Sequence, residues 1–264
     1  MAFVAVPGPF DFALSTERFR VFGVDRATVW HEGGLHRVVN GREVRIEAAE
    51  GGVDVEPLEP GVEYLLGGPF DLDGFYDWAR GDEVLRHAVV RLRGFRPPLL
   101  PDPFEMLVGA ITAQQVSLFS ATAIRNRLIE RFGERHEIAW AFPTRHRLAR
   151  ANEGELTAVG FSRRKEEYTL ALARSDLDLD VLRELPDDEV RARIVAQRGL
   201  GEWTAEWFLA RHLARPNAWP WGDLALRKAV ADLYRGLDVR EARERFHPFE
   251  NLSAHYLLLA QRAP

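Results

Sequence analysis

Residues 190–213 read VRARIVAQRGLGEWTAEWFLARHL, and this stretch decides the fold. It predicts an amphipathic helix, a turn at Gly199, Leu200 and Gly201, and a second helix rich in small and aromatic residues. The two glycines permit positive φ angles and the close approach of a foreign backbone, while Leu200 can pack between the helices. Backbone amides at the start of the second helix would bind an anion, and a DNA phosphate suits them because this contact needs no base identity. An ordinary helical hairpin without a ligand is the alternative interpretation.

The segment RPNAWPWGDLALRKAV, residues 215–230, follows the second helix and contains the carboxylate of Asp223. Because Asp223 follows Pro220 and Gly222 and precedes a helical pattern, we expect it to cap the N-terminus of a new helix. A carboxylate placed after a phosphate-binding hairpin could also reach the sugar of the nucleotide beside the bound phosphate. That sugar carries the glycosidic bond.

The composition narrows the classes of protein that the chain can represent. With 264 residues and 46% hydrophobic content, it can form one large domain or a few small ones. The absence of cysteine excludes disulfides, thiol nucleophiles, zinc knuckles and thiolate-held iron–sulfur clusters. The histidines lack the HxxxH and HExxH spacings, and no glycine-rich phosphate loop occurs, so we expect neither a side-chain metal site nor an organic cofactor.

The first residues, MAFVAVPGPFDF, bear on the location of the protein. They lack a basic leader, and Pro7, Gly8 and Pro9 interrupt the apolar run, which argues against a signal peptide. No stretch approaches the roughly 20 apolar residues that a membrane span needs. We therefore expect a protein of the cytoplasm.

Charge is distributed unevenly along the chain, although the net charge is only −5. Residues 1–90 hold 8 Arg and Lys against 16 Asp and Glu, whereas residues 91–165 hold 13 against 7. The acidic part would face away from a nucleic acid. Nearly all the cations are arginines, which suit phosphate binding but can equally reflect genomic base composition.

The pattern of apolar residues predicts an α+β fold. The first 70 residues alternate short apolar runs with turns at Asn40-Gly41 and at residues 32–34, which is typical of antiparallel strands. Helical periodicity follows, including an apolar helix over Phe104–Phe119, and the proline-rich residues 94–103 predict a linker. We expect a sheet domain with a flanking helix over residues 1–90 and an all-α body of two helical subdomains over residues 91–264.

Several stretches resemble one family. GLGEWTAEWF at residues 199–208, followed by WPWGDLALRKA at residues 219–229, resembles the helix-hairpin-helix and downstream aspartate signature of base-excision DNA glycosylases. Three further stretches are similar to the 3-methyladenine DNA glycosylase II branch: PGPFDF at residues 7–12, DPFEMLVGAITAQQVS at 102–117 and FPTRHRLARANEGELTAVGFSRRKEEY at 142–168. The resemblance implies that the sheet domain is like the TATA-binding-protein-type domain of this branch.

The resemblance also implies the chemistry. Asp223 takes the place of the catalytic aspartate, whose carboxylate stabilises a cationic sugar. Members that also cleave the strand carry a lysine two residues after the second glycine, and this chain has Trp203 there, so no Schiff base is expected. Trp203 and Trp207, on one face of the helix, would stack on a flipped, cationic base. Core packing is the alternative role for both tryptophans.

DNA contacts follow from the same resemblance. Gln115 would fill the gap left by the flipped base, although a solvated glutamine is the alternative. The backbone carbonyls of Val195, Gln197 and Leu200 would hold a monovalent cation, Na⁺ or K⁺, that bridges to a phosphate. Arg198 stands where the family commonly has proline, and it could add a phosphate contact of its own. The expected DNA-binding residues of the hairpin are Arg198, Gly199, Leu200, Gly201 and Thr204.

The C-terminal segment departs from the family pattern. Glu250 stands where an arginine is common, and Leu258 stands where the branch has a pocket tryptophan. One wall of the base pocket is therefore undefined. Trp219 and Trp221 could contribute to it, but we expect them to pack beneath the loop that carries Asp223.

These inferences combine into one functional hypothesis. The chain would be a monofunctional glycosylase that flips alkylated purines such as 3-methyladenine and 7-methylguanine out of duplex DNA and hydrolyses their N-glycosidic bonds. It would act on damaged duplex DNA as a monomer, require no cofactor beyond a possible monovalent cation, and work at the nucleoid of a bacterial cytoplasm. The alternatives are a glycosylase of the same fold for oxidised or mispaired bases and a hairpin module that binds DNA without catalysis.

Overall fold

The computed structural model describes residues 1–21 and 23–261. Five strands form one antiparallel sheet in the order β1-β5-β4-β3-β2. Their bounds are Ala2–Ala5 (β1), Thr28–His31 (β2), Gly34–Val39 (β3), Arg42–Ala49 (β4) and Gly52–Glu56 (β5). Asn40 and Gly41 both have positive φ in the turn between β3 and β4, as the primed hairpin turns require. The predicted antiparallel sheet is therefore confirmed.

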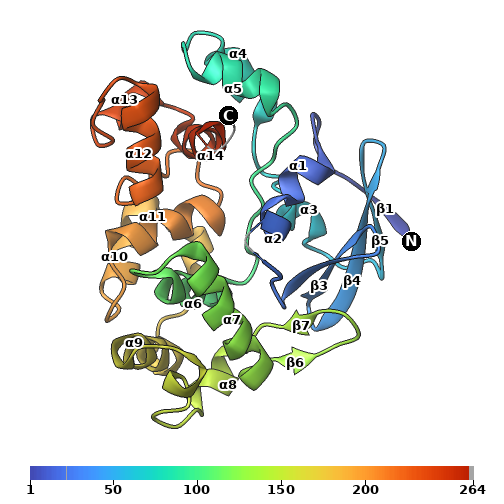
Figure 1. The fold of residues 1–264 in the computed structure, drawn as a ribbon, viewed down its shortest axis with the longest axis vertical. Coiled ribbons are helices and arrows are strands. Elements are labelled where there is room, and N and C mark those ends of the chain that lie inside the picture. Colours follow the sequence, from blue (N-terminus) through green and yellow to red (C-terminus); the bar gives the residue numbers. More distant parts are fainter. Residues whose placement is uncertain (22, 262–264) are drawn as a thin grey trace.

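The sheet buries one face against short helices. Val44 and Ile46 on β4 are fully buried while the residues between and beside them are partly exposed, which is the alternation of a half-buried strand. The helices of this part are α1 (Phe12–Thr16), α2 (Arg18–Val21) and α3 (Val62–Leu65). Figure 1 shows them beside the sheet, forming with it a lobe that is separate from the helical lobe.

The helical lobe follows in the chain. Its helices are α4 (Leu72–Ala79), α5 (Leu85–Arg91), α6 (Pro103–Ala113), α7 (Leu118–Phe132), α8 (Arg145–Ala149), α9 (Arg163–Arg174), α10 (Asp187–Val195), α11 (Glu202–Arg211), α12 (Leu224–Leu233), α13 (Ala242–Arg245) and α14 (Glu250–Ala260), with 3₁₀ turns η1 (Thr157–Val159) and η2 (Val181–Glu184). A two-stranded ribbon, β6 (Glu134–Arg135) and β7 (Trp140–Ala141), interrupts this series. The described helices do not include one long and apolar enough to cross a membrane.

Two apolar cores divide the helical lobe. One core gathers α6, α7, α9, α10 and α11, and the other gathers α4, α5, α12 and α14. Helices α4 and α5 belong to the part of the chain that we expected in the sheet domain, up to residue 90. They pack with the C-terminal helices rather than with the sheet core. Helix α5 contacts α14, and the ring of Phe75 on α4 lies 4.9 Å from the ring of Tyr256 on α14.

The single helix predicted over Phe104–Phe119 is wrong, because the chain forms two helices there. Helix α6 ends at Ala113, and α7 begins after Ser117, whose hydroxyl accepts a hydrogen bond from the amide of Ser120. Ser117 is a good N-cap, so the sequence contains the start signal of α7 within the apolar run. The break creates an exposed loop at Gln115 between the two helices.

Candidate active site and hairpin

The hairpin joins α10 to α11 through residues 196–201. Gly199 has a φ of 83°, and a Cβ atom there would lie 2.1 Å from the ring of Tyr168. Only glycine fits this position, because both the backbone and the tyrosine exclude a side chain. Gly201 differs from the expectation of positive φ: it is extended, with φ −121°, and nothing lies within 4 Å of its Cβ position. Gly201 therefore leaves open space in front of the start of α11.

The start of α11 is suited to an anion. Gly201 is the N-cap residue and provides no side chain to cap the first amides of the helix. The hairpin is held in place by Gln114, whose Nε2 donates to the carbonyl of Gly199 at 2.9 Å. Leu200 is buried in the core between α10 and α11, as expected from the sequence.

Two hairpin residues differ in how far they can reach DNA. Arg198 is exposed and pairs with Glu167 at 2.7 Å, an exposed ion pair of the kind that contributes little and can be exchanged for a phosphate. Thr204, by contrast, has a buried side chain, and its N–H donates to the carbonyl of Gly201 at 2.9 Å. Its place on the inner face of α11 explains this difference.

The carbonyls expected to hold a cation fit that role. Within the described residues, those of Val195 and Leu200 accept no hydrogen bond, and that of Gln197 accepts one, from the amide of Leu200 at 3.1 Å. Val195, Gln197 and Leu200 would therefore hold a Na⁺ or K⁺ ion with backbone oxygens, the ligand type that such hard cations prefer. The ion would add a positive charge for a phosphate at the hairpin. No group of three or more His, Asp and Glu side chains within residues 1–21 and 23–261 is placed to hold a metal.

Asp223 is the N-cap of α12, as predicted. Its Oδ1 accepts hydrogen bonds from the amides of Ala225 at 2.9 Å and Leu226 at 3.0 Å. Its Oδ2 faces two indoles and accepts from Nε1 of Trp207 at 3.1 Å and, less closely, from Nε1 of Trp203 at 3.5 Å. One oxygen thus anchors the helix, and the other is held in place by the two tryptophans.

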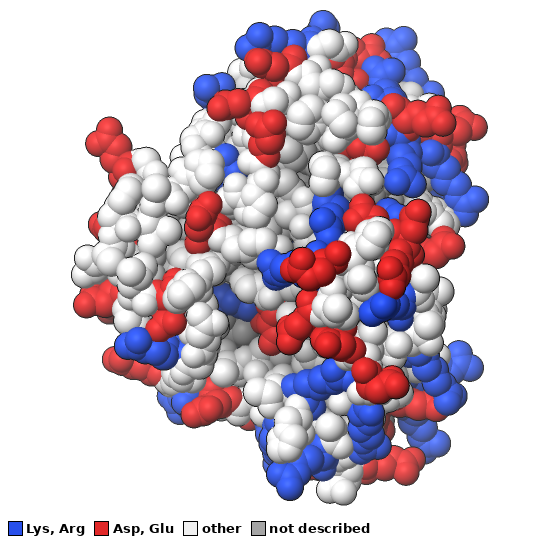
Figure 2. Space-filling view, turned by 180° about the vertical axis from the view of Figure 1, so that it is seen from behind, with Lys and Arg blue, Asp and Glu red and all other residues white. Residues whose placement is uncertain are grey.

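A cavity of about 310 Å³ adjoins this carboxylate. Trp203, Trp207, Asp223 and Leu258 line it, together with residues from the sheet lobe and from α6 and α7. The volume is in the range of small-molecule sites, and the cavity lies where the two lobes meet. Figure 2 shows the surface hollowed between the sheet lobe and the helical lobe.

The two tryptophans occupy different environments. Trp203 is partly exposed, whereas Trp207 is buried, with the ring of His255 edge-on at 5.6 Å and the guanidinium of Arg211 5.4 Å from its ring centre. Burial, with a smaller contribution from the charge of Arg18, lowers the pKa of His255 to about 3. His255 is therefore neutral at pH 7 and adds no positive charge beside Trp207.

Gln115 lies on the exposed loop between α6 and α7 with a φ of 55°, a conformation that residues other than glycine rarely adopt. Exposed apolar side chains follow it in the chain, namely Val116, Leu118 and Phe119. A residue held in such a conformation on an exposed loop suggests a functional constraint. The neighbouring Gln114 instead supports the hairpin.

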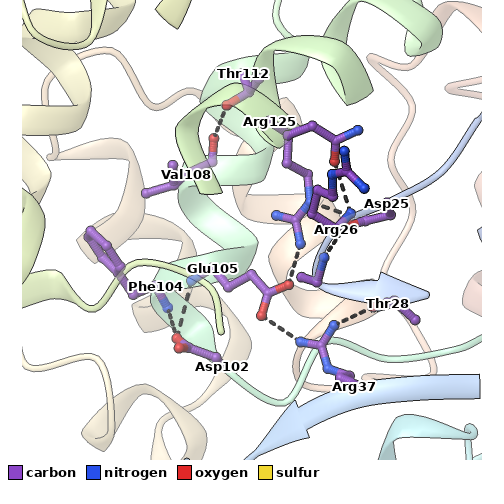
Figure 3. A network of polar contacts seen from close by, with 12 residues as sticks. Asp25, Arg26, Thr28, Arg37, Asp102, Phe104, Glu105, Val108, Thr112 and Arg125 are labelled. Carbon is purple, nitrogen blue, oxygen red and sulfur yellow. Dashed lines mark hydrogen bonds and ion pairs between the residues drawn. The ribbon is translucent and has the colours of Figure 1, made fainter. Parts of the chain in front are cut away.

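A buried ionic network that the sequence does not predict lies at the interface between the lobes. Glu105 on α6 accepts from Arg37 on β3 and from Arg125 on α7, each at 2.5 Å, and Arg125 also pairs with Asp25 at 3.2 Å (Figure 3). Burial would raise the pKa of Glu105, but the charges of Arg37 and Arg125 outweigh it and lower the pKa. The four residues lie far apart in the sequence, so no local motif could have identified them.

The remaining candidate residues near Asp223 either pack in the core or line the cavity. Trp219 is 1% exposed, and its Nε1 donates to the carbonyl of Val239 at 2.7 Å, which makes it a core residue beneath the loop. Leu258 lines the cavity at the position where the family pattern has a tryptophan. Basic side chains gather on the helical lobe near α8 and α9, while the sheet lobe shows more acidic ones (Figure 2).

Comparisons with known proteins agree with this geometry. The model of the HhH-GPD superfamily of base excision DNA repair proteins matches residues 108–251. DNA-3-methyladenine glycosylase of Bacillus subtilis is 31% identical over 173 residues, covering 61% of this chain and 57% of that protein, so the chain spans little more than half of that relative. DNA-3-methyladenine glycosylase 2 of Escherichia coli is 29% identical over 185 residues, which cover 67% of this chain and 65% of that protein.

A solved structure extends the match to the whole chain. The 3-methyladenine DNA-glycosylase from Archaeoglobus fulgidus superposes with a TM-score of 0.88 at 30% identity, covering 99% of this chain and 98% of that one. The resemblance to the 3-methyladenine DNA glycosylase II branch is thereby confirmed. The chain belongs to the HhH-GPD superfamily of base excision DNA repair proteins.

Proposed function

We propose that the protein is a DNA glycosylase that removes alkylated purines, of the 3-methyladenine and 7-methylguanine type, from duplex DNA. One observation carries the proposal: the Asp223 carboxylate is held by two indole N–H groups at the wall of a cavity beside a helix-hairpin-helix. A base stacked inside a duplex cannot reach such a cavity, so the damaged nucleotide would have to flip out to enter it.

The reaction follows from these residues. Trp203, the more exposed indole, stacks on the flipped base, whose positive charge after alkylation favours an electron-rich ring. The bond between the sugar C1′ and the base breaks, and its electron pair leaves with the base and neutralises it. Asp223 stabilises the positive charge that develops on the sugar, and a water molecule bonds to C1′ while its proton passes to the carboxylate. The products are the free base and an abasic site.

We further propose that the enzyme lacks lyase activity. Strand cleavage by this family requires an amine at the sugar, and the chain has only two lysines, Lys165 and Lys228. Neither lines the cavity, and the Nζ of Lys165 donates to the carbonyl of Thr112 at 2.9 Å. The place of the attacking lysine is taken by Trp203.

The duplex would be held without reading its sequence. The amides at the start of α11, with Arg198 and a monovalent cation on the hairpin carbonyls, would bind phosphates near the lesion, and Gln115 would occupy the gap in the base stack. Asp223, the cavity and the hairpin all belong to one chain, which supports action as a monomer.

The experiment is base release from three duplexes that contain methylated purines, 8-oxoguanine or no damage. We expect free 3-methyladenine or 7-methylguanine by mass spectrometry from the first duplex alone, with strand breaks only after alkali treatment. Release of 8-oxoguanine alone would establish a glycosylase for oxidised bases instead. Breaks without alkali would overturn the absence of lyase activity, and DNA binding without any release would overturn the catalytic role.

A further inference from the structure

The cavity beside Asp223 is also lined by a charged group that the proposed reaction does not use. Arg125 on α7 and Gly109 on α6, which are neighbours in space, form this part of the lining. Arg125 is anchored on two sides, since its Nη2 donates to Glu105 at 2.5 Å and its Nε donates to Asp25 at 3.2 Å. Its Nη1 makes no hydrogen bond within residues 1–21 and 23–261, and the guanidinium lies 4.8 Å from the centre of the Phe142 ring.

The carboxylates bonded to Arg125 have no free oxygen. Both oxygens of Glu105 accept from arginines, and those of Asp25 accept from Arg125 and from the amide of Ala27 at 2.9 Å. The network therefore presents a fixed donor to the cavity and no free acceptor. A ligand that reaches Arg125 must offer an acceptor to Nη1.

Gly109 provides the access to this donor. A Cβ atom on Gly109 would have one neighbour within 4 Å outside its own helix, namely Nη1 of Arg125 at 4.0 Å. The missing side chain thus leaves space immediately in front of Nη1. Glycine disfavours a helix interior, and its presence in α6 is explained by this opening rather than by backbone conformation.

Purines differ at the edge that would meet this donor. The glycosidic bond lies on the five-membered ring, so a base whose sugar is beside Asp223 directs its six-membered ring away from that carboxylate. Guanine carries a keto oxygen at position 6, which accepts hydrogen bonds, whereas adenine carries an amino group there, which donates. Methylation at N7 of guanine leaves this keto oxygen available.

We propose that Arg125 and Gly109 form a specificity subsite in which Nη1 of Arg125 donates to the 6-keto oxygen of a flipped, alkylated guanine. The proposal rests on the proposed glycosylase function and assigns 6-keto purines as the substrates that this subsite favours. Because the guanidinium is fixed by Glu105 and Asp25 before the base arrives, the donor needs little reorganisation to act.

The test uses one duplex, methylated so that it contains both 7-methylguanine and 3-methyladenine, and measures the ratio of the released bases. Gly109→Ala places a methyl group in front of Nη1 while improving helix propensity. Arg125→Lys keeps the charge beside Glu105 but removes the guanidinium and with it the Nη1 donor. Each variant should lower the ratio of 7-methylguanine to 3-methyladenine about tenfold, the loss of one hydrogen bond from a charged donor. Gly81→Ala, whose added Cβ meets only the Trp78 carbonyl at 3.6 Å, is the control and should keep the wild-type ratio.

The ratio separates this proposal from folding and from the proposed function. A partly unfolded variant releases less of both bases but at an unchanged ratio. A wild-type ratio in both Gly109→Ala and Arg125→Lys, with both bases still released, would overturn the subsite while leaving the glycosylase intact. Release of neither base by the wild type would overturn the glycosylase itself.

Discussion

Replacing Trp207 with phenylalanine should separate two roles that this residue could have. The indole is buried, and its Nε1 donates to Oδ2 of Asp223 at 3.1 Å, the shorter of the two indole contacts to that oxygen. We therefore assign Trp207 as a positioning residue for the carboxylate and leave stacking on the base to Trp203. Phenylalanine keeps an aromatic ring and most of the packing, and it removes the donor.

The size of the effect follows from the hydrogen bond. A bond to a charged group contributes about 1.5–3 kcal/mol, which corresponds to about 10- to 150-fold in the rate of base excision. Because the bond orients Asp223 for the transition state, we expect the loss in the single-turnover rate and not in the affinity for damaged DNA. If Trp207 instead stacks on the flipped base, the substitution should weaken binding to damaged DNA.

The assay compares Trp207→Phe with Tyr234→Phe, a matched control. Tyr234 is also buried and donates to a carboxylate, Oδ1 of Asp82 at 2.7 Å, in the other helical core. Both variants should lose stability in urea unfolding, but only Trp207→Phe should excise slowly when each is compared at equal folded concentration. Equal excision rates for the two variants would refute the positioning role.

Three further predictions test the hairpin, the ionic network and the buried histidine. Gly199→Ala should cost about 1–3 kcal/mol of unfolding free energy because its methyl group meets Tyr168, while Gly201→Ala should keep stability and weaken binding to an abasic duplex in fluorescence anisotropy; equal stabilities would contradict the hairpin geometry. Glu105→Gln should lose about 3–5 kcal/mol in urea unfolding because two buried arginines lose their partner. Glu130→Gln, which breaks the exposed pair with Arg26, should lose less than about 1 kcal/mol, and similar losses would argue against a buried network. The pKa of His255 lies at about 3 in the folded protein, so the unfolded chain binds the proton first as the pH falls below about 6.5, and stability should drop by about 2 kcal/mol at pH 5 through this residue. His255→Phe should remove that part of the pH dependence, and an unchanged pH dependence would show that the pKa of His255 does not differ between the folded and unfolded protein.

Local signals were sufficient for much of the architecture. Asn40 and Gly41 predict a hairpin turn because asparagine and glycine are the residue types that most readily adopt positive φ. Asp223 was predicted as a helix cap from Pro220, Gly222 and the helical pattern that follows, and it caps α12. The antiparallel sheet and the helical body followed from changes in the period of the apolar residues.

Features that depend on tertiary contacts could not be predicted from the sequence. The split of the predicted long helix has a local cause instead, because Ser117 is an N-cap signal in the sequence, but the apolar residues on both sides of it favoured one continuous helix. Tyr168 excludes a side chain at Gly199 only once α9 packs on the hairpin. Glu105 is paired with two arginines from other elements, Arg37 in the sheet and Arg125 in the next helix, and no spacing rule links these positions.

The role of Asp223 is tested most directly by Asp223→Asn, measured for base release from methylated duplex DNA and for binding to the same duplex. Asparagine caps helices as well as aspartate does, so α12 should form and the variant should fold and bind. Without the charge, base release should fall about a hundredfold or more while the affinity for the duplex stays at the wild-type level. Base release at the wild-type rate would contradict the account and leave Asp223 as a helix cap alone.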